Sequence, residues 1–268
     1  PAEQRLLPAL RHDDCRPFRP LRKTFRAASR AGQAGASLTD PLAFPGNTPI
    51  SFDSGQATLR GLLTLPAQFA GLVVLAHAGP QPEARDDALA VVLQHAGVGT
   101  LTLDLLTPAE ERFADIHHNV SLLARRLLDG LTLLKQRMLL GELPTLPIGL
   151  CASGDGSPVA LRAAAVRDHD IFAVVCRGGL IDLAGMLYLR SLASPLLVLV
   201  AADDERVAAS NRRALGELRC DKELKLLPAS GEQPDAVADF ACAARETAHW
   251  FVRHLAARAA TARAGNAT

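Results

Sequence analysis

The sequence is poor in several features, and each shortage excludes a class of protein. Aromatic residues make up only 4% of the 268 residues, with one Trp and one Tyr, so a surface that stacks nucleic-acid bases is not expected. A net charge of +1 also argues against a nucleic-acid partner. The longest apolar run, Leu196 to Ala202, is far shorter than the roughly 20 residues of a membrane-spanning helix. No apolar signal-peptide core is found near the N-terminus, and no membrane partner is expected.

Cysteine is also scarce, and the spacing of the cysteines matches no disulfide or metal-binding pattern. The five cysteines are an odd number, lie far apart and form no C-x-x-C pair. They therefore predict neither a disulfide framework nor a zinc site. Free thiols are typical of cytoplasmic proteins, so we expect a cytoplasmic protein without a metal or other cofactor.

The overall composition, with 49% hydrophobic and 21% charged residues, is typical of a globular protein. Charged residues and prolines are, however, unevenly distributed along the chain. Residues 1–49 hold eight Lys or Arg against four Asp or Glu, and seven of the 17 prolines. We expect a basic, loosely ordered arm over 1–49 and one domain over 50–268. The arm could be a tail without a function, a segment that docks on an acidic partner, or an organelle transit peptide, against which Asp13 and Asp14 count.

From residue 50 onward, strand patterns alternate with helical patterns. The later strands are apolar runs, which is the pattern of strands buried on both faces of a parallel sheet. We predict an α/β domain with a doubly wound, mostly parallel sheet flanked by helices. The expected strands cover residues 58–65, 71–75, 98–103, 147–150, 171–176, 196–200 and 223–227. The expected helices cover residues 83–95, 116–138, 157–166, 208–218 and 237–260.

Ligands of such sheets bind beyond the carboxyl ends of the strands, and one strand end is rich in glycine. The turn over 151–157 does not suit a phosphate loop, because Asp155 and Gly156 stand where Lys and Ser or Thr are needed. It does not suit a dinucleotide-binding turn either, because Val159 replaces the third glycine. A nucleophile elbow, which is a sharp strand-to-helix turn, fits its position best.

At these strand ends the sequence resembles the α/β-hydrolase superfamily, and within it the dienelactone-hydrolase-type branch. The resemblance covers about residues 50–255 and implies an α/β-hydrolase fold. It also implies a Ser–Asp–His set that hydrolyses carboxylic esters or lactones. The matching stretches are His77-Ala78-Gly79, Leu103 to Pro108, Ile148-Gly149-Leu150, Arg177 to Leu183 and Leu196 to Asp204.

The family's catalytic motifs fall on altered residues in this sequence. The elbow pattern small-x-Ser-x-Gly falls on residues 152–156 and puts Gly154 at the nucleophile position. The G-G-x-D pattern of the acid puts Asp204 in its place, and the P-G-x-x-H pattern puts Glu232 at the histidine position. The resemblance therefore implies a degenerate triad in which only the acid is retained.

Three residues remain as candidate catalytic groups: Ser153, Asp204 and Glu232. Ser153 is the hydroxyl nearest to the elbow, but it stands one residue early and has no histidine base to activate it. The carboxylates of Asp204, Glu232 and Asp155 could converge, which would raise one pKa or attract a metal ion. They could equally be separate loop caps.

Other strand-end residues are candidates for ligand binding or for a structural role. The resemblance implies that the Ala78 backbone N–H points at an oxyanion, while His77 supports that loop. Arg177 could neutralise one of the carboxylates or bind an acidic ligand through two parallel hydrogen bonds. Asp155, beside the elbow, is a further candidate binding residue. Cys151 is expected to be a small buried hydrophobe. His117 and His118 are expected to be solvated at the start of a helix.

Two functions remain open for the domain. The favoured one is a hydrolase fold retained for binding or assembly, with weak or absent activity, because catalytic residues act as a unit and two of three are replaced. The alternative is an active ester or lactone hydrolase that uses Ser153 or a water activated by Glu232. The expected partners are a small-molecule ester, an acidic ligand or further copies of the chain.

Overall fold

The computed structural model describes residues 46–79, 83–167, 170–228 and 236–265. Within these residues, eight strands form a single sheet in the order β1-β2-β4-β3-β5-β6-β7-β8. In chain order the strands are β1 (Gly46–Ser54), β2 (Ala57–Leu65), β3 (Leu72–His77), β4 (Gly99–Asp104), β5 (Ile148–Ser153), β6 (Ile171–Arg177), β7 (Leu196–Ala201) and β8 (Lys222–Leu227).

The sheet is parallel except at one edge. β1 pairs with β2, and β2 with β4, in antiparallel fashion, whereas the pairs from β4 through β8 are parallel. The helices are α1 (Glu83–His95), α2 (Val120–Leu139), α3 (Gly156–Arg167), α4 (Met186–Ser191), α5 (Glu205–Glu217) and α6 (Ala236–Gly265), with 3-10 helices η2 (Ala114–His118) and η3 (Ile181–Ala184).

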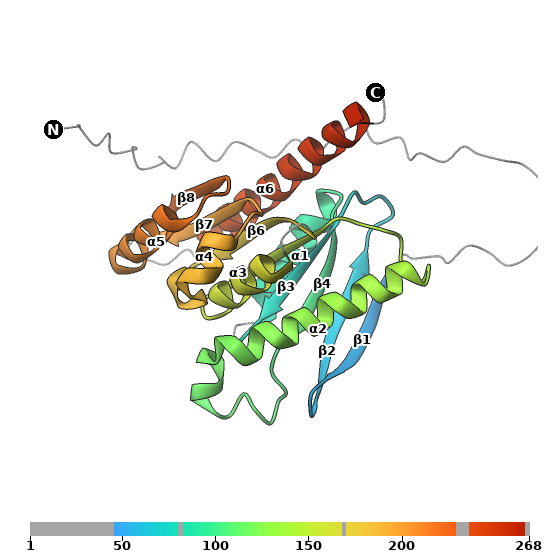
Figure 1. Cartoon of the computed structure of the whole chain (residues 1–268), viewed down its shortest axis with the longest axis horizontal. Helices are drawn as coiled ribbons and strands as arrows, with labels where there is room; N and C mark the ends of the chain where they lie inside the picture. Colours follow the sequence, from blue (N-terminus) through green and yellow to red (C-terminus); the bar gives the residue numbers. More distant parts are fainter. Residues whose placement is uncertain (1–45, 80–82, 168–169, 229–235, 266–268) are drawn as a thin grey trace, which may run out of the picture.

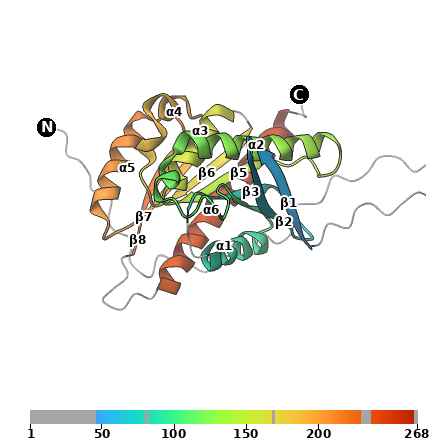
Figure 2. The same cartoon turned by 90° about the horizontal axis from the view of Figure 1, so that it is seen from below.

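The helices cover both faces of the sheet. Viewed along the sheet, α2, α3, α4 and α5 lie on one side and α1 and α6 on the other (Figures 1 and 2). The doubly wound, mostly parallel arrangement that the sequence predicts is therefore confirmed. It brings the carboxyl ends of β3, β5, β6 and β7 to one edge, where ligands of this fold class bind.

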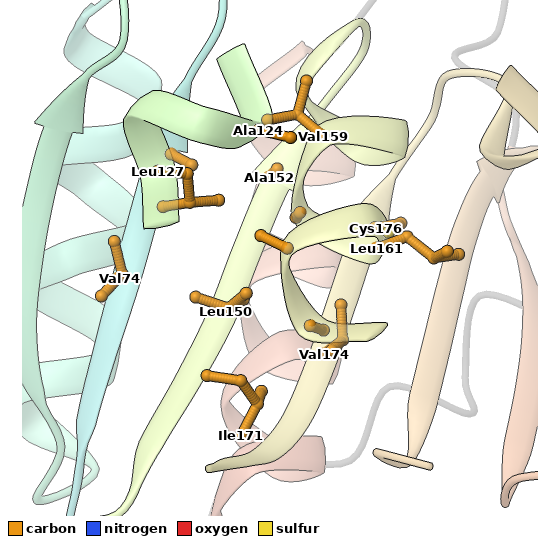
Figure 3. Close-up of a cluster of buried hydrophobic side chains, with 14 of the residues drawn as sticks. Val74, Ala124, Leu127, Leu150, Ala152, Val159, Leu161, Ile171, Val174 and Cys176 are labelled. Atoms are coloured by element: carbon orange, nitrogen blue, oxygen red, sulfur yellow. The ribbon is translucent and has the colours of Figure 1, made fainter. Parts of the chain in front are cut away.

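Two hydrophobic layers form the core, one on each face of the central strands. On one face, Val74, Leu150 and Val174 pack beneath Leu127 of α2 and Val159 of α3 (Figure 3). The second layer is formed by the same strands, because alternate residues of each strand point to opposite faces of the sheet. It packs the sheet against α1 and α6, and its members include Val73, Leu75, Cys151, Val175, Phe172 and Phe251.

Two local predictions near the site are wrong, and hydrogen bonds explain both. The helix expected over 116–138 is interrupted, because the Asn119 side chain accepts a hydrogen bond from the Leu122 N–H at 3.1 Å and caps α2. Ser157 is not a helix cap. It lies inside α3, fully buried, and its hydroxyl donates to the Gly178 carbonyl at 2.8 Å.

Other boundaries shift by a few residues. β5 extends to Ser153, three residues beyond the expected strand, and α5 begins at Glu205 rather than at residue 208. No strand was expected at β1, which begins at Gly46 and buries only Ile50 and Ser54. Most of the predicted arm, residues 1–45, lies outside the described residues.

The helices in the described parts of the chain are all too short or too polar to cross a membrane.

Candidate functional site at the carboxyl edge of the sheet

A sharp turn built around Gly154 joins β5 to α3. Gly154 has a φ of +52°, in the left-handed region that glycine adopts without strain. Its N–H donates to the Arg177 carbonyl at 3.0 Å, and its own carbonyl accepts from the Ser157 N–H at 3.0 Å. The turn has the form of a nucleophile elbow, and its apex carries a hydrogen atom in place of a side chain.

The loop that follows β6 lies directly against this elbow. Gly179 has a φ of +76°, and a Cβ added to it would lie 2.0 Å from the Gly154 carbonyl oxygen, so no side chain fits there. Asn211 of α5 is buried and fixes the same loop, since its amide donates to the Gly179 carbonyl at 2.9 Å and accepts from the Ile181 N–H at 3.1 Å. The backbone around Gly154 is therefore held on two sides.

Two backbone N–H groups flank the apex. Ala78 follows β3 and lies beside the first turn of α3, because a Cβ added to Gly156 would lie 3.5 Å from the Ala78 Cβ. Asp155 follows Gly154 directly. Neither N–H donates to an oxygen of any residue that the structure describes. In α/β-hydrolases the oxyanion is stabilised by two backbone N–H groups, one from the residue after the nucleophile and one from the loop after the third strand. The role that the sequence predicts for Ala78 in this way stays a prediction.

The two histidines of η2 differ: His118 is exposed, as expected for a solvated helix start, whereas His117 is buried against the loop after β3. His117 is only 8% exposed, and its Nδ1 donates to the Ala78 carbonyl at 3.0 Å. A Cβ on Gly79 would lie 2.9 Å from the same nitrogen, so the imidazole packs on Gly79. His118 Nδ1 lies 3.5 Å from Asp155 Oδ2, and both of these side chains are exposed.

A network of charged side chains lies beneath the elbow, on the α1 and α6 face. His77 Nδ1 donates to Asp104 at 3.2 Å, while His77 Nε2 lies 2.5 Å from Asp86 Oδ2 without hydrogen-bond alignment. Asp86 also pairs with Arg177. Asp86 is 2% exposed, and it occupies the apolar face of α1 three positions before buried Leu89. A carboxylate at an apolar helix position was the one sequence signal for this network, and it was missed.

The network fixes the protonation of its members. Burial alone would lower the pKa of His77, but the hydrogen bond to Asp104 and the close negative charges of Asp104 and Asp86 outweigh burial and raise the pKa to about 9. Burial acts to raise the pKa of Asp86, but His77 and Arg177 hold the pKa below its usual range. His77 is therefore an imidazolium at neutral pH and has no free electron pair with which to act as a base.

The predicted site residues are distributed around this geometry. Ser153 is the last residue of β5, on the same face as Cys151 by strand alternation, and it pairs in register with Arg177. Arg177 meets Asp86 rather than a predicted carboxylate. Burial raises the pKa of the Cys151 thiol to about 11, so it is protonated and inert at neutral pH.

The two predicted carboxylates that the structure describes, Asp204 and Asp155, have separate partners. Asp204 caps α5, where its side chain accepts from the Val207 N–H at 3.0 Å. Asp155 faces His118. Glu232, the residue at the histidine position, lies outside the described residues.

A second charged pair, which the sequence patterns did not indicate, shapes the loop after β4. Arg126 of α2 is buried, donates to the Leu105 carbonyl at 2.8 Å and forms a two-pronged pair with Glu110 at 2.7 and 2.9 Å. The Thr107 N–H and hydroxyl donate to Glu110 as well. The hydrogen bonds and charge of Arg126 lower the pKa of Glu110 to about 2. This pair holds the loop that leads to η2 and His117.

Proteins of known structure have the same fold as this chain, and some relatives are also similar to it in sequence. No family model matches the chain. A dienelactone hydrolase from Anabaena variabilis is 31% identical, with a TM-score of 0.71, and the match covers 78% of this chain and 98% of that structure. The esterase Est1E from Butyrivibrio proteoclasticus is 13% identical, with a TM-score of 0.63 over 78% of this chain and 99% of its own, which shows the fold alone.

Curated relatives are longer than this chain. Proteins from two strains of Mycobacterium tuberculosis, provisionally named phosphoribosyl transferase, are 33% identical over 243 residues. The match covers 88% of this chain but 52% of each relative. The chain thus spans about half the length of the curated relatives it matches.

Proposed function

Because the chain belongs to the dienelactone hydrolase family of α/β-hydrolases, we propose that it binds a small carboxylic ester or carboxylate above Gly154 without forming an acyl-enzyme. The observation that carries this proposal is the glycine at the apex of the elbow. Covalent catalysis in this fold needs a side-chain nucleophile at that apex, and Gly154 provides none.

The binding half of the proposal rests on the donors that remain. The N–H groups of Ala78 and Asp155 have no partner among the described residues. Asp155 directly precedes α3, and Ala78 lies beside the first turn of that helix. Backbone donors at a helix N-terminus favour an oxygen that carries negative charge. An ester carbonyl or a carboxylate oxygen is a ligand of that kind.

Hydrolysis through Ser153 is the alternative, and the geometry supports it less well. Ser153 ends the strand and lies on the α1 and α6 face, one position before the apex. The histidine at the end of the adjacent strand β3, His77, is protonated and held by two carboxylates. The phosphoribosyl transferase name of the mycobacterial relatives is not extended to this chain, because the part that they share has a hydrolase fold.

Restoring the nucleophile and the base tests the proposal. We expect slow hydrolysis of p-nitrophenyl acetate by the wild type, and little gain from Gly154→Ser or Glu232→His alone. The double variant should exceed the sum of the single variants, since a general base contributes roughly 10²–10⁴-fold and acts together with its nucleophile. Circular dichroism of each variant controls for folding, since a serine at positive φ costs roughly 1–2 kcal/mol.

Two further measurements address binding and the alternative. Titration with butyrate should shift the NMR amide signals of Ala78 and Asp155, while the distant hairpin amide of Gly55 stays unchanged. Rapid turnover by the wild type, with a fluorophosphonate probe attached to Ser153, would show that Ser153 is the nucleophile and contradict the proposal.

A further inference from the structure

One buried histidine holds the loop in which Ala78 presents its N–H. Ala78 is the first residue after β3, which ends at His77. A backbone carbonyl can only accept a hydrogen bond, so the Nδ1 of His117, which lies 3.0 Å from the Ala78 carbonyl oxygen, carries a proton and donates it. A Cβ on Gly79 would lie 2.9 Å from the same nitrogen. The glycine at position 79 therefore leaves the room that the imidazole occupies.

The direction of the Ala78 N–H follows from its peptide unit. In a planar trans peptide the C=O and the N–H point to opposite sides. The His77 carbonyl of this unit accepts from the N–H of Leu105, which follows β4, at 2.9 Å. The Ala78 N–H therefore points away from β4. Since β3 lies between β4 and β5, it points to the side of β3 where β5 and the Gly154 elbow lie.

The Asp155 N–H is directed by the same reasoning from the other side. The Gly154 carbonyl of its peptide unit accepts from the Ser157 N–H at 3.0 Å and lies against Gly179, in the loop after β6. The Asp155 N–H therefore points away from that loop, and β3 lies on the other side of β5 from β6. Each N–H thus points toward the side that carries the other, which is the arrangement that binds one anionic oxygen.

We propose that His117 is a positioning residue for carboxylate binding, because it fixes the peptide unit that follows Ala78. Leu105 holds the unit before Ala78 and His117 holds the unit after it, so both backbone torsions of Ala78 are set. Ala78 lies beyond the last paired position of β3, His77, so the sheet does not set them. The inference rests on the proposed function, in that the carboxylate binds at the N–H groups of Ala78 and Asp155.

Two substitutions at this position separate the donor from the volume of the ring. In His117→Asn the amide nitrogen is bonded to Cγ, as Nδ1 is, and can still donate to the Ala78 carbonyl. In His117→Leu most of the volume stays but the donor is lost. Because a hydrogen bond to a charged oxygen is at stake, we expect His117→Leu to raise the Kd for butyrate by about tenfold or more. His117→Asn should remain within about threefold of the wild type.

Ser194→Ala is the matched control. Ser194 is buried, and its hydroxyl donates to the Ile171 carbonyl at 2.9 Å. Ile171 begins β6, so this bond lies at the edge of the sheet opposite to the elbow. The variant removes a side-chain donor from a buried carbonyl, as His117→Leu does. It should lower the stability of the fold and leave the Kd for butyrate unchanged.

The amide signals give a readout that a merely structural role would not move. In His117→Leu, titration with butyrate should still shift the NMR signal of the Asp155 amide, whereas the shift of the Ala78 amide should be largely lost. A general loss of stability would weaken both shifts together.

Gly79→Ala tests the same contact from the other partner. Its Cβ would collide with the imidazole, so the substitution should weaken butyrate binding in the wild type. In a His117→Ala background the room of the ring is empty, and Gly79→Ala should weaken binding no further. This comparison decides the matter even if His117→Leu does not fold.

Three outcomes would each overturn the inference and leave the proposed function standing. They are an unchanged Kd in His117→Leu, equal losses in His117→Leu and His117→Asn, and a Gly79→Ala effect that is the same with and without His117. If butyrate shifts neither the Ala78 nor the Asp155 amide of the wild type, the proposed function fails and the inference fails with it.

Discussion

At the level of single residues, the elbow is made almost entirely of backbone. Gly154 and Gly179 both have positive φ, and the Cα of Gly179 packs on the Gly154 carbonyl. The buried side chains of Ser157 and Asn211 bind the carbonyls of the Gly178-Gly179 loop and fix its position. The geometry of the site thus depends on the positive φ of Gly154 and on Gly179, where no side chain fits.

Two adjacent glycines allow this dependence to be measured. Gly178→Ala should cost roughly 1–2 kcal/mol of unfolding free energy, because Gly178 has a φ of +69° but nothing lies within 4 Å of its added Cβ. Gly179→Ala should cost about 3–5 kcal/mol, because it adds a collision with the Gly154 carbonyl to the same backbone strain. Urea denaturation measures both, and equal losses would show that the close approach carries no energy.

At the level of elements, α1 is attached to the sheet by charge as well as by apolar packing. Asp86 lies between His77 of β3 and Arg177 of β6. The Arg177 guanidinium also lies 5.9 Å from the ring of Phe240 in α6. One carboxylate therefore joins a helix to two strands that have β5 between them.

Removing that carboxylate should leave the buried Arg177 guanidinium without its carboxylate partner and His77 with Asp104 alone. We expect Asp86→Asn to lower the unfolding free energy by about 3–5 kcal/mol. The neighbouring residue Asp87 is exposed, and Asp87→Asn should change the unfolding free energy by less than about 0.5 kcal/mol. Urea denaturation of both variants decides the matter. A loss below about 1 kcal/mol for Asp86→Asn would mean that the network is solvated and contributes little.

At the level of the whole molecule, the same network predicts how stability depends on pH. The folded state raises the pKa of His77 from 6.5 to about 9. The folded protein therefore binds a proton that the unfolded chain has released, and the resulting stabilisation is complete below pH 6.5. It should be lost as pH rises toward about 9, by up to about 3 kcal/mol.

Chemical denaturation at a series of pH values between 6 and 10 measures this slope. His77→Gln should flatten it, because glutamine does not titrate. A wild-type protein whose stability is constant over that range would show that His77 is not protonated in the folded state.

The sequence predicted the sheet better than it predicted the site. Apolar runs and glycine turns were enough for seven strands and for their parallel packing. The edge strand β1 was missed because its exposed positions break the apolar pattern. The helix break at Asn119 was missed because the apolar stripe continues across it, while a single side-chain hydrogen bond ends the helix.

The site was harder because its contacts join distant segments. Nothing near Asp86 in the sequence shows that it will meet His77 and Arg177, although its place on an apolar helix face was a usable signal. His117 could not be assigned to Ala78 before η2 was known to be a separate helix. The predicted histidine position, Glu232, lies outside the described residues and stays a prediction.

The Asp86–Arg177 pair also has a consequence for the order of folding. Its partners are 91 positions apart in the chain, and we therefore expect the pair to form late in folding. Contacts of such separation form late, since the chain must give up the entropy of a long loop first. The pair therefore acts on the rate of unfolding more than on the rate of folding. By slowing unfolding, the pair should prolong the lifetime of the folded elbow.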